Sequence, residues 1–464
     1  MTVRWIAIDT DYATYADLQE RHVVAQGWSR LGNMTDFILQ NRQETVQNVK
    51  QSIENMLLNA QYANVQQNLP GRLYVYFFKL QPDGILVAIE GVNGRGVCSL
   101  DEGFQYHFCE DPEIEYAHEF CPVEWVDWND VSPNWTPQPP AQGVLSIANA
   151  RQDGEEISTR YHLYIQQREA EREMQHWAAL LRAQKQIIFT GPPGAGKTLL
   201  AKRLAAYMLT NAVPEIREVD NVLAMRRMPF QEGQPGAWDI VQFHPSYNYD
   251  DFVRGIRIRT KDGQTVYTVE DGPLLKMAAQ AQAHPGQTFI LIIDEINRAN
   301  VAAVLGEMIY ALEYRGLPVT LQYGDGDATT CLPKENFYII GTMNTADRSI
   351  GHIDYAVRRR FAFVPLHPDR NVVAASHQDE AFGRAALAKF EAVAALFTGE
   401  QALLSADYRA EDVQPGHSYF LVENNDDLNR RMKYQIGPLL REYVADGVLK
   451  TEAIPRIEEI EGNA

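Results

Sequence analysis

The second half of the sequence predicts an α/β fold built on a parallel sheet, and three observations support this prediction. From Gln186 onward, short β-branched runs alternate with helical patterns, which is typical of strands joined by covering helices. One of these runs leads directly into a glycine-rich GxxxxGKS/T sequence and then into a helical pattern. A later run ends in two adjacent acids, at the edge where such sheets bind ligands.

The length and composition indicate several domains. The chain has 464 residues, which exceeds one compact core, and its 45% hydrophobic and 22% charged residues are ordinary for a globular protein. We expect four parts: a small N-terminal α+β domain over residues 1–130, a linker and helical connection over 131–184, the α/β core over 185–366 and a C-terminal helical region over 367–464. The prolines of SPNWTPQPPAQG, from Ser132 to Gly143, mark the linker.

The charge of the chain limits how it could bind nucleic acid. The net charge is −19, and residues 1–150 contain 8 basic and 19 acidic side chains. Proteins that grip nucleic acid through its phosphates usually present a basic surface. Any contact with DNA would therefore come from a local pocket, a local basic stripe or a partner chain. The alternative is that the chain touches no nucleic acid.

Targeting signals and metal motifs are not evident in the sequence. No apolar run is long enough to span a bilayer, and the N-terminus has no basic region followed by an apolar one. The four cysteines lack CxxC spacing, which argues against a structural zinc site and for a reducing compartment. We therefore predict a cytoplasmic protein that does not bind a membrane.

The glycine-rich sequence predicts a phosphate-binding loop. Its residues are Gly191, Pro192, Pro193, Gly194, Ala195, Gly196, Lys197 and Thr198, and they follow a short apolar strand at 187–190. Glycines let the backbone curl so that several N–H groups point at phosphates, and the following helix N-terminus adds partial positive charge. Lys197 can reach the β- and γ-phosphates, and Thr198 can ligate magnesium. The alternative is a chance glycine-rich turn, which the flanking strand and helix disfavour.

The two adjacent acids predict the second half of the same site. The apolar run from Phe289 to Ile293 indicates a strand buried on both faces, and it ends in Asp294 and Glu295. Asp294 is placed to hold the magnesium ion, directly or through water. Glu295 is the candidate that orients and polarises the attacking water. A pair of solvated acids is the alternative, which a phosphate-binding loop in the same chain disfavours.

Two further motifs follow. A third strand, at 337–342, leads to Asn344, whose amide fits a sensor of the γ-phosphate or of the attacking water. Farther on, Arg358, Arg359 and Arg360 end a helical stretch. Arginine stabilises the charge on a transferring phosphoryl group and can act from a neighbouring subunit. A surface ion pair is the alternative for each arginine, and their spacing does not show which one acts.

These motifs together resemble the AAA+ domain of the McrB family of modification-dependent (type IV) restriction systems. The resemblance lies in GPPGAGKT, LIIDEINRAN, GTMNTADRSI and DYAVRRRF, of which MNTADRS is the most specific part. QFHPSYNYDDFVRGIR, from Gln242 to Arg257, resembles the family's segment between the two nucleotide motifs. GHSYF, at 416–420, resembles a motif of its C-terminal helical lid. The resemblance covers roughly residues 185–445.

The resemblance implies an AAA+ P-loop NTPase that assembles as a hexameric ring. Members of the family usually hydrolyse GTP rather than ATP and drive a separate nuclease subunit, McrC. By resemblance, Arg358 or Arg359 supplies the arginine finger that acts with Glu295 and Asn344. Candidates for subunit-interface contacts are Asn297, Arg298, Asp347 and Arg348. The residues themselves leave the choice between GTP and ATP open.

The chain lacks a recognisable nuclease motif of its own. Pro82-Asp83 precedes Glu90, but no lysine follows at the spacing of a PD…D/ExK site. We therefore expect DNA cleavage to need the partner subunit.

Residues 1–130 contain short β-like runs in an order that resembles EVE domains. EVE domains are relatives of the YTH fold and form small β-barrels that hold a modified base. We expect strands at 5–9 and 23–28, a hairpin of 73–78 with 85–92, and a last strand at 118–128. In the EVE family a strand ending in Gly-Trp, here Gly27-Trp28, and a closing H-x-x-x-x-V-x-W strand recur. The resemblance implies binding of modified double-stranded DNA.

Aromatic side chains of this region are candidates for a base pocket. An enzyme or reader that flips a base out of the duplex stacks the base on aromatic rings and checks its edge by hydrogen bonds. Trp28, Tyr76, Trp125 and Trp128 are candidate walls. Asn33 or Asp36 could contact the edge of the base. The alternative for each ring is that it fills the core of the domain.

A remodelling chaperone of the MoxR type, whose N-terminal domain binds protein, is the competing function. The acidic N-terminal region favours this alternative, whereas the McrB-like segments favour the restriction motor. A scaffold that does not hydrolyse nucleotide is disfavoured, because Lys197, Asp294, Glu295 and Asn344 are all present.

Overall fold

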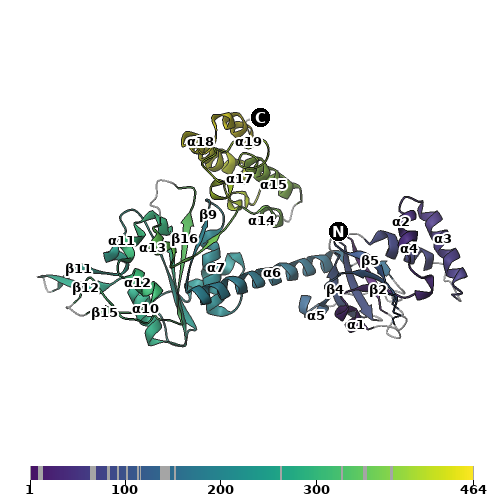
Figure 1. Cartoon of the computed structure of the whole chain (residues 1–464), viewed down its shortest axis with the longest axis horizontal. Coiled ribbons are helices and arrows are strands. Elements are labelled where there is room, and N and C mark those ends of the chain that lie inside the picture. Colours follow the sequence, from purple (N-terminus) through teal and green to yellow (C-terminus); the bar gives the residue numbers. More distant parts are fainter. Residues whose placement is uncertain are drawn as a thin grey trace. The chain divides into compact units, whose positions relative to one another are not determined.

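A computed structural model describes most of the chain. The described residues are 2–8, 14–62, 69–80, 84–90, 93–100, 103–111, 114, 116–135, 147–150, 153–261, 264–324, 328–347, 353–376 and 380–462. They form two compact units, Met1–Glu169 and Ala170–Ala464 (Figure 1). Helix α6 (Gly154–Gln184) contributes residues to both units. Most of the predicted proline-rich linker, from residue 136 to 143, lies outside the described residues.

The first unit contains two small sheets. One has the strand order β7-β4-β3-β1-β8, with β1 parallel to β3 and the other neighbours antiparallel, and the second is antiparallel with the order β2-β6-β5. The strands are β1 (Val3–Ala7), β2 (Val24–Gln26), β3 (Ile85–Glu90), β4 (Asn93–Ser99), β5 (Gln105–Phe108), β6 (His118–Cys121), β7 (Val126–Asp127) and β8 (Ile147–Asn149). Alternate residues of β3 enter two separate cores, Leu86 and Ala88 one and Val87 and Ile89 the other.

The described residues of the first unit form the helices α1 (Tyr15–Glu20), α2 (Thr35–Gln40), α3 (Val46–Asn59), α4 (Leu69–Lys79) and α5 (Trp128–Val131). Helices α2, α3 and α4 lie side by side (Figure 1). The predicted hairpin of 73–78 with 85–92 is wrong, because 73–78 belongs to α4 and the antiparallel partner of β3 is β4. Leu73, Tyr76 and Phe77 are buried at helical spacing, so one face of this aromatic-rich helix packs on the core.

The predicted strands around the Gly-Trp and closing motifs are shorter than expected. Strand β2 ends at Gln26, and Trp28 adopts a left-handed backbone with φ of 64°. The closing run 118–128 is divided into β6 and β7, and Trp128 begins α5. Pro122 follows β6 and has no N–H for a strand ladder, which agrees with the break.

The second unit confirms the predicted α/β fold with a parallel sheet. Its five strands are all parallel in the order β10-β13-β16-β9-β17. They are β9 (Gln186–Gly191), β10 (Gly236–Gln242), β13 (Thr288–Asp294), β16 (Phe337–Asn344) and β17 (Ala362–Pro365). The registers Asn344↔Gly191 and Gln242↔Asp294 bring the carboxyl ends of these strands to one edge of the sheet. The three strands predicted around the nucleotide motifs are therefore neighbours.

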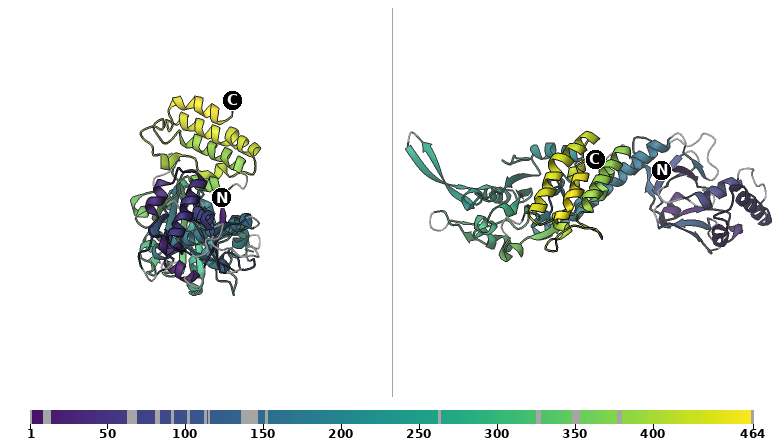
Figure 2. Two further views of the ribbon diagram at one scale, coloured as in Figure 1. Left: turned by 90° about the vertical axis from the view of Figure 1, so that its right-hand side faces the viewer. Right: turned by 90° about the horizontal axis from the view of Figure 1, so that it is seen from above.

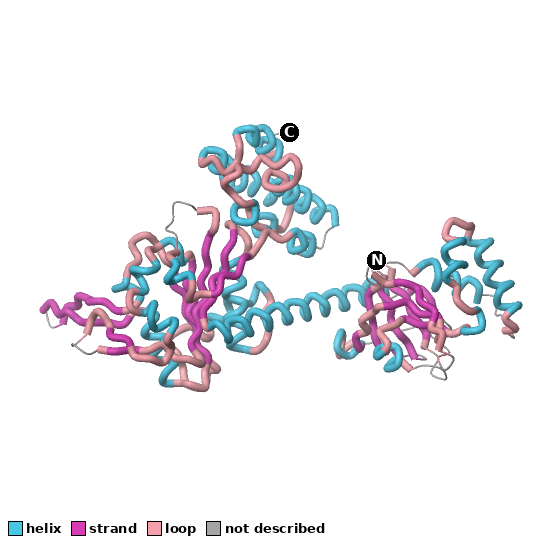
Figure 3. Tube along the Cα trace, viewed as in Figure 1, coloured by secondary structure: helices cyan, strands magenta, loops and turns pink. Residues whose placement is uncertain are grey.

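Helices cover both faces of this sheet, as Figure 3 shows. Leu291 and Ile293 of β13 face one apolar cluster, and Ile290 and Ile292 face another. The helices of this part are α7 (Lys197–Thr210), α8 (Val219–Ala224), α9 (Tyr249–Phe252), α10 (Pro273–Ala283), α11 (Val301–Leu305), α12 (Met308–Glu313) and α13 (Tyr355–Arg358). Two hairpins, β11 (Arg254–Lys261) with β12 (Gln264–Asp271) and β14 (Val319–Thr320) with β15 (Thr329–Thr330), complete it. The first hairpin projects away from the sheet (Figure 2).

The C-terminal part is helical and has an apolar core of its own. Its helices are α14 (Arg370–Ala375), α15 (Glu380–Ala394), α16 (Ala410–Val413), α17 (Asn425–Arg431), the π-helical turn Met432–Ile436, α18 (Gly437–Ala445) and α19 (Ile454–Ile460). This arrangement confirms the predicted helical lid. Among the described residues, no helix is both long enough and apolar enough to cross a membrane.

Candidate active site

The predicted phosphate-binding loop connects β9 to α7. Gly194 and Gly196 have φ of 79° and 81°, a left-handed backbone that residues with a Cβ rarely adopt. Gly196 precedes α7, so the N–H groups of the first turn of that helix follow the loop directly. The loop therefore has the strand–loop–helix context that a phosphate-binding site needs.

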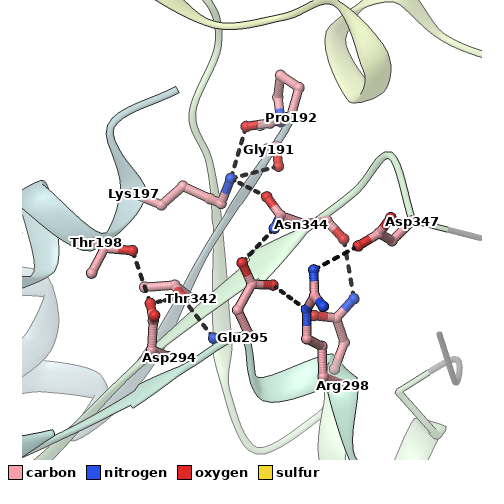
Figure 4. Close-up of polar contacts among 11 residues, drawn as sticks. Gly191, Pro192, Lys197, Thr198, Asp294, Glu295, Arg298, Thr342, Asn344 and Asp347 are labelled. Carbon is pink, nitrogen blue, oxygen red and sulfur yellow. Dashed lines mark hydrogen bonds and ion pairs between the residues drawn. The ribbon is translucent and has the colours of Figure 1, made fainter. Parts of the chain in front are cut away.

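The Lys197 ammonium lies at the centre of the site (Figure 4). Its Nζ donates to the carbonyl oxygens of Gly191 at 3.0 Å and Pro192 at 2.7 Å, and to Asn344 Oδ1 at 2.7 Å. Burial lowers the pKa of Lys197 to about 8. The described residues place no carboxylate within ion-pair distance of it. A buried cation held only by neutral oxygens suits an anionic ligand such as a polyphosphate.

The side-chain oxygens of Thr198, Asp294 and Thr342 form a cluster beside the lysine (Figure 4). Asp294 Oδ1 accepts hydrogen bonds from Thr198 Oγ1 at 2.8 Å and from Thr342 Oγ1 at 2.7 Å. A hydroxyl and a carboxylate are the ligand types that Mg²⁺ takes in proteins, with phosphate and water completing its shell. Thr342 was not predicted as a site residue, although its position two residues before Asn344 in the same strand was a signal that could have identified it.

Glu295 and Asn344 are brought together from two neighbouring strands. Asn344 Nδ2 donates to Glu295 Oε1, while its Oδ1 accepts from Lys197. The Glu295 N–H donates to Thr342 Oγ1 at 3.0 Å, and its backbone has φ of 53°. Burial raises the pKa of Glu295, although the nearby Arg298 opposes the shift. A carboxylate of raised pKa, fixed at a strand end, suits a general base.

The residues that follow these motifs take different positions. Arg298 forms ion pairs with Glu295 at 3.4 Å and Asp347 at 3.2 Å, and both Arg298 and Asp347 keep exposed surface. Asn297 is only 2% exposed, and its Nδ2 donates to the Asn344 carbonyl at 3.1 Å. The expected interface contact of Asn297 is therefore wrong, since the side chain positions the Asn344 strand end instead. Arg348 lies outside the described residues.

The lid segment 416–420 contacts the phosphate-binding loop directly. The Gly416 N–H donates to the Pro193 carbonyl at 2.8 Å, and the Ser418 N–H donates to the Gly194 carbonyl at 3.0 Å. A Cβ at Gly416 would lie 2.1 Å from the Gly194 carbonyl carbon, so only glycine fits there. The His417 ring lies against Gly196, and burial lowers the pKa of this histidine. The GHSYF motif therefore belongs to the site.

The three arginines at the end of α13 are distinguished by their partners. Glu313 forms ion pairs with Arg359 at 2.9 Å and with Arg360 at 2.6 Å. Arg358 is exposed and stacks over the Phe363 ring at 5.1 Å from its centroid. Among the described residues, no acid lies within ion-pair distance of Arg358. It is thus the arginine of the three whose guanidinium has no acidic partner within the described part of the chain.

Three of the four candidate base walls in the first unit are core residues. Tyr76, Trp125 and Trp128 are 0%, 4% and 2% exposed. Tyr76 Oη donates to the Val24 and His118 carbonyls, and the Trp125 and Trp128 ring N–H groups donate to the Val23 and Trp135 carbonyls. The prediction of these three as walls is wrong, because each buried ring has a polar tip that reaches a backbone acceptor.

The remaining candidates lie nearer the surface. Asn33 Oδ1 accepts from the Thr35 N–H at 3.0 Å, which serves the turn before α2, and Asp36 is exposed on that helix. Trp28 is half-buried, and its carbonyl accepts from His118 Nε2 at 3.0 Å. A bulky residue with a left-handed backbone is uncommon and often lies at a functional position.

Comparisons with known proteins agree with this site. Residues 222–361 match the AAA domain of the dynein-related subfamily, residues 403–453 match the α-helical lid domain of McrB, and residues 165–267 match the ChlI subunit of magnesium chelatase. The first match covers Asp294, Glu295 and the arginines of α13, the second covers part of the C-terminal helical region, and the third covers the phosphate-binding loop.

Two curated relatives belong to restriction systems. The chain is 35% identical over 289 residues to the Type IV methyl-directed restriction enzyme EcoKMcrB subunit of Escherichia coli (strain K12), with 59% of this chain and 56% of that protein covered. It is 28% identical over 206 residues to the Type II restriction enzyme BsuMI component YdiS of Bacillus subtilis (strain 168), with 39% and 57% covered. The chain thus spans little more than half the length of either relative. A solved structure of NtrX from Brucella abortus is 12% identical, with a TM-score of 0.28 over 65% of this chain and 72% of that one, a likeness too weak to bear on function.

Proposed function

We propose that this chain, an AAA+ P-loop NTPase with a McrB-type helical lid, is the motor of an McrBC-like restriction system. The observation that carries the proposal is the linked set Lys197–Asn344–Glu295, beside Thr198 and Asp294, under a lid of that type. A protein that only binds nucleotide does not need a general base linked to the phosphate-binding lysine, so this arrangement favours hydrolysis. The relatives are restriction-system components, which supports the proposed setting.

The proposed reaction is hydrolysis of a nucleoside triphosphate. Lys197 supplies positive charge to the β- and γ-phosphates, and the loop N–H groups hold them. Glu295 accepts a proton from water as its oxygen attacks the γ-phosphorus, and the nucleoside diphosphate leaves. Asn344 forms hydrogen bonds with both Lys197 and Glu295, so it holds the ammonium and the general base in fixed positions relative to each other. Thr198 and Asp294 would hold Mg²⁺, which neutralises phosphate charge when it is bound.

The choice of nucleotide belongs to this proposal. The McrB resemblance favours GTP over ATP, while the phosphate-binding loop serves either. We would measure phosphate release from both nucleotides at equal concentrations, with and without a cognate McrC-like nuclease subunit. The proposal expects faster release from GTP and stimulation by the nuclease. If neither GTP nor ATP is hydrolysed, whether or not the nuclease subunit is present, the proposal is wrong.

A hexameric ring with catalysis across the subunit boundary is also proposed. Arg358 is our candidate for the arginine finger rather than Arg359, because Glu313 neutralises Arg359 within the chain. The exposed Arg298 and Asp347 remain candidates for contacts at the same boundary.

Residues 1 to about 135 are proposed to read modified double-stranded DNA. The EVE-like Gly-Trp and H-x-x-x-x-V-x-W motifs and the unusual backbone of Trp28 support this proposal. The domain is acidic, so it gains little affinity from phosphate neutralisation and needs a pocket. Retention of methylated over plain duplex by the full chain at fixed salt is expected. Equal weak binding of both, with binding of a protein ligand instead, would favour the MoxR-like remodelling chaperone.

A further inference from the structure

The first unit contains a cavity of about 630 Å³ that is separate from the predicted tryptophan walls. It lies between α2, α4 and the segment around β5, and its size falls in the range of small-molecule sites. Trp28, Tyr76, Trp125 and Trp128 do not line it. The cavity is therefore a site different from the one predicted from the sequence.

Aromatic rings form the walls of this cavity, and apolar side chains form its floor. Tyr74 and Phe78 of α4 stack on each other, with ring centroids 5.5 Å apart and planes 16° from parallel. Phe104 and Tyr106 line it from the β5 segment, and all four rings are half-buried. The side chains of its floor are largely buried, and they are Ile38, Phe77, Leu80 and Phe120. Half-buried rings offer stacking surface to a planar ligand.

The cavity is lined by two basic side chains, Arg42 and Lys79, and by one acid, Glu44, so its lining carries more positive than negative charge although the domain is acidic. Arg42 and Lys79 line it, and Lys50 and Lys79 lie over the Tyr74 ring at 5.9 Å and 5.8 Å from its centroid. These are three of the 8 basic residues in 1–150. Within the described part of the chain, none of the three has a carboxylate at ion-pair distance. Unpaired cations around an aromatic pocket are complementary to a ligand that has a planar ring and flanking phosphates.

Two polar groups define the geometry inside. Tyr106 Oη accepts from the Met34 N–H at 3.2 Å and donates to His118 Nδ1 at 2.7 Å, so this ring is fixed in place. Asn41 Nδ2 donates to the Phe37 carbonyl at 2.8 Å, which leaves Asn41 Oδ1 to accept from a ligand. A fixed wall and an oriented acceptor lower the cost of ordering the site on binding.

We propose that this cavity receives a single methylated base flipped out of a DNA duplex. The base stacks between the α4 and β5 rings, and Arg42 and Lys79 contact the phosphates beside it. The apolar floor accepts the methyl group, and Asn41 Oδ1 accepts a hydrogen bond from the edge of the base. This inference rests on the proposed reading of modified DNA, and it places the base site on α4 and β5 rather than on Trp28.

The test compares duplexes that differ only in one base. Binding of the full chain to methylated, hydroxymethylated and plain duplexes is measured at fixed salt. Phe78→Leu keeps an apolar side chain but removes the stacking face, and we expect about a fivefold or greater loss of affinity for methylated duplex alone. Lys79→Gln should weaken all three duplexes alike and reduce the salt slope by about one, whereas Arg72→Gln, on the same helix, should not.

A matched pair of surface variants tests the pocket without disturbing the core. Leu39 lines the cavity and is 56% exposed, while Leu58 on α3 does not line it and is 58% exposed. Leu39→Trp should obstruct the mouth and abolish the preference for methylated duplex, and Leu58→Trp should leave that preference intact. A 2-aminopurine placed beside the methylated base loses its stacking neighbour when that base is flipped out, so its fluorescence should rise on binding to the parent chain but not to Leu39→Trp.

The outcomes separate this inference from the proposed function. If the parent binds none of the duplexes, both fail. If the parent prefers methylated duplex and Trp28→Ala removes this preference while Phe78→Leu and Leu39→Trp do not, the function stands and the pocket assignment is wrong. If binding is equal for all duplexes and unchanged by every variant, the cavity does not read DNA, and a protein ligand becomes the better hypothesis.

Discussion

Glu295 and Lys197 contact the same Asn344 side chain, yet they should fail differently when replaced. Glu295→Gln keeps the size and the acceptor for Asn344 but removes the base, so we expect unchanged nucleotide binding and a loss of about 10²–10⁴ in turnover. Lys197→Ala removes the ammonium that donates to the carbonyls of the phosphate-binding loop, and no other side-chain cation among the described residues does so. We therefore expect weaker nucleotide binding. Fluorescent-nucleotide titration and phosphate release measure the two effects.

The exposed Glu232 supplies a control for this pair. Glu232→Gln lies outside the site and should change neither binding nor turnover. Turnover by Glu295→Gln at the parent rate would show that another group activates water.

His118 is the residue whose charge should govern the acid stability of the first unit. Burial lowers the pKa of His118 to about 4, against about 6.5 in an unfolded chain. Between pH 6.5 and 4 the unfolded chain binds more protons, so the free energy of unfolding falls as the pH falls. The shift corresponds to about 3 kcal/mol, present above pH 6.5 and lost by pH 4.

Denaturant unfolding followed by tryptophan fluorescence can measure this loss, since five of the seven tryptophans lie in residues 1–169. His118→Gln can still donate to the Trp28 carbonyl but does not titrate, so its pH profile should be flatter than that of the parent chain by about this amount. Parallel profiles would mean that groups other than His118 set the acid stability.

At the scale of elements, the contact of the lid with the phosphate-binding loop depends on one glycine. Gly416→Ala would place a Cβ 2.1 Å from the Gly194 carbonyl carbon and 2.3 Å from the Ala195 nitrogen. The segment must withdraw, which breaks the hydrogen bonds of Gly416 and Ser418 at about 0.5–1.5 kcal/mol each. We expect lower thermal stability and, since the loop loses its support, nucleotide affinity weaker by on the order of tenfold.

Gly286→Ala is the matched control, because nothing lies within 4 Å of the Cβ that it would introduce. It should leave the melting temperature and nucleotide affinity close to those of the parent chain. Full nucleotide affinity and stability in Gly416→Ala would mean that the lid contact contributes nothing to the site.

At the scale of the whole molecule, the proposed ring predicts that activity can be restored between defective chains. Arg358→Ala should bind nucleotide normally and lose about 10³–10⁵ in turnover, because the finger acts on the site of a neighbour. Mixing Arg358→Ala with Glu295→Gln should recover part of the activity, since some boundaries then combine an intact arginine with an intact glutamate.

Arg359→Ala is the control for this experiment. Arg359 is paired with Glu313 in its own chain, so we expect a smaller loss of turnover and no dependence on mixing. Rescue of Arg359→Ala but not of Arg358→Ala would reverse the assignment, and rescue of neither would argue that both arginines are structural.

The residues of the proposed nucleotide site could be predicted from the sequence, because each of its parts is a short local motif. Gly194, Gly196 and Lys197 belong to one loop of consecutive residues, and Asp294 and Asn344 each come at the end of a short apolar run that predicts a buried strand. Parallel strands then bring their carboxyl ends to one edge, so the meeting of these residues follows from the fold class. In the structure Asn344 pairs with Gly191 across neighbouring parallel strands, which brings the two motifs together as expected.

Properties that depend on partners far away in the chain could not be predicted from the sequence and became visible in the folded molecule. Arg358 and Arg359 are adjacent in the sequence, and Glu313, 46 residues from Arg359, distinguishes them. Segment 73–78 has the β-branched and aromatic residues of a strand, but its burial at helical spacing against the sheet favours α4. Tyr76 and Tyr74, two residues apart on that helix, therefore point to different surroundings, one into the core and the other into the cavity. Periodicity and composition do not encode which face of an element meets which neighbour, because that depends on packing between segments far apart in the chain.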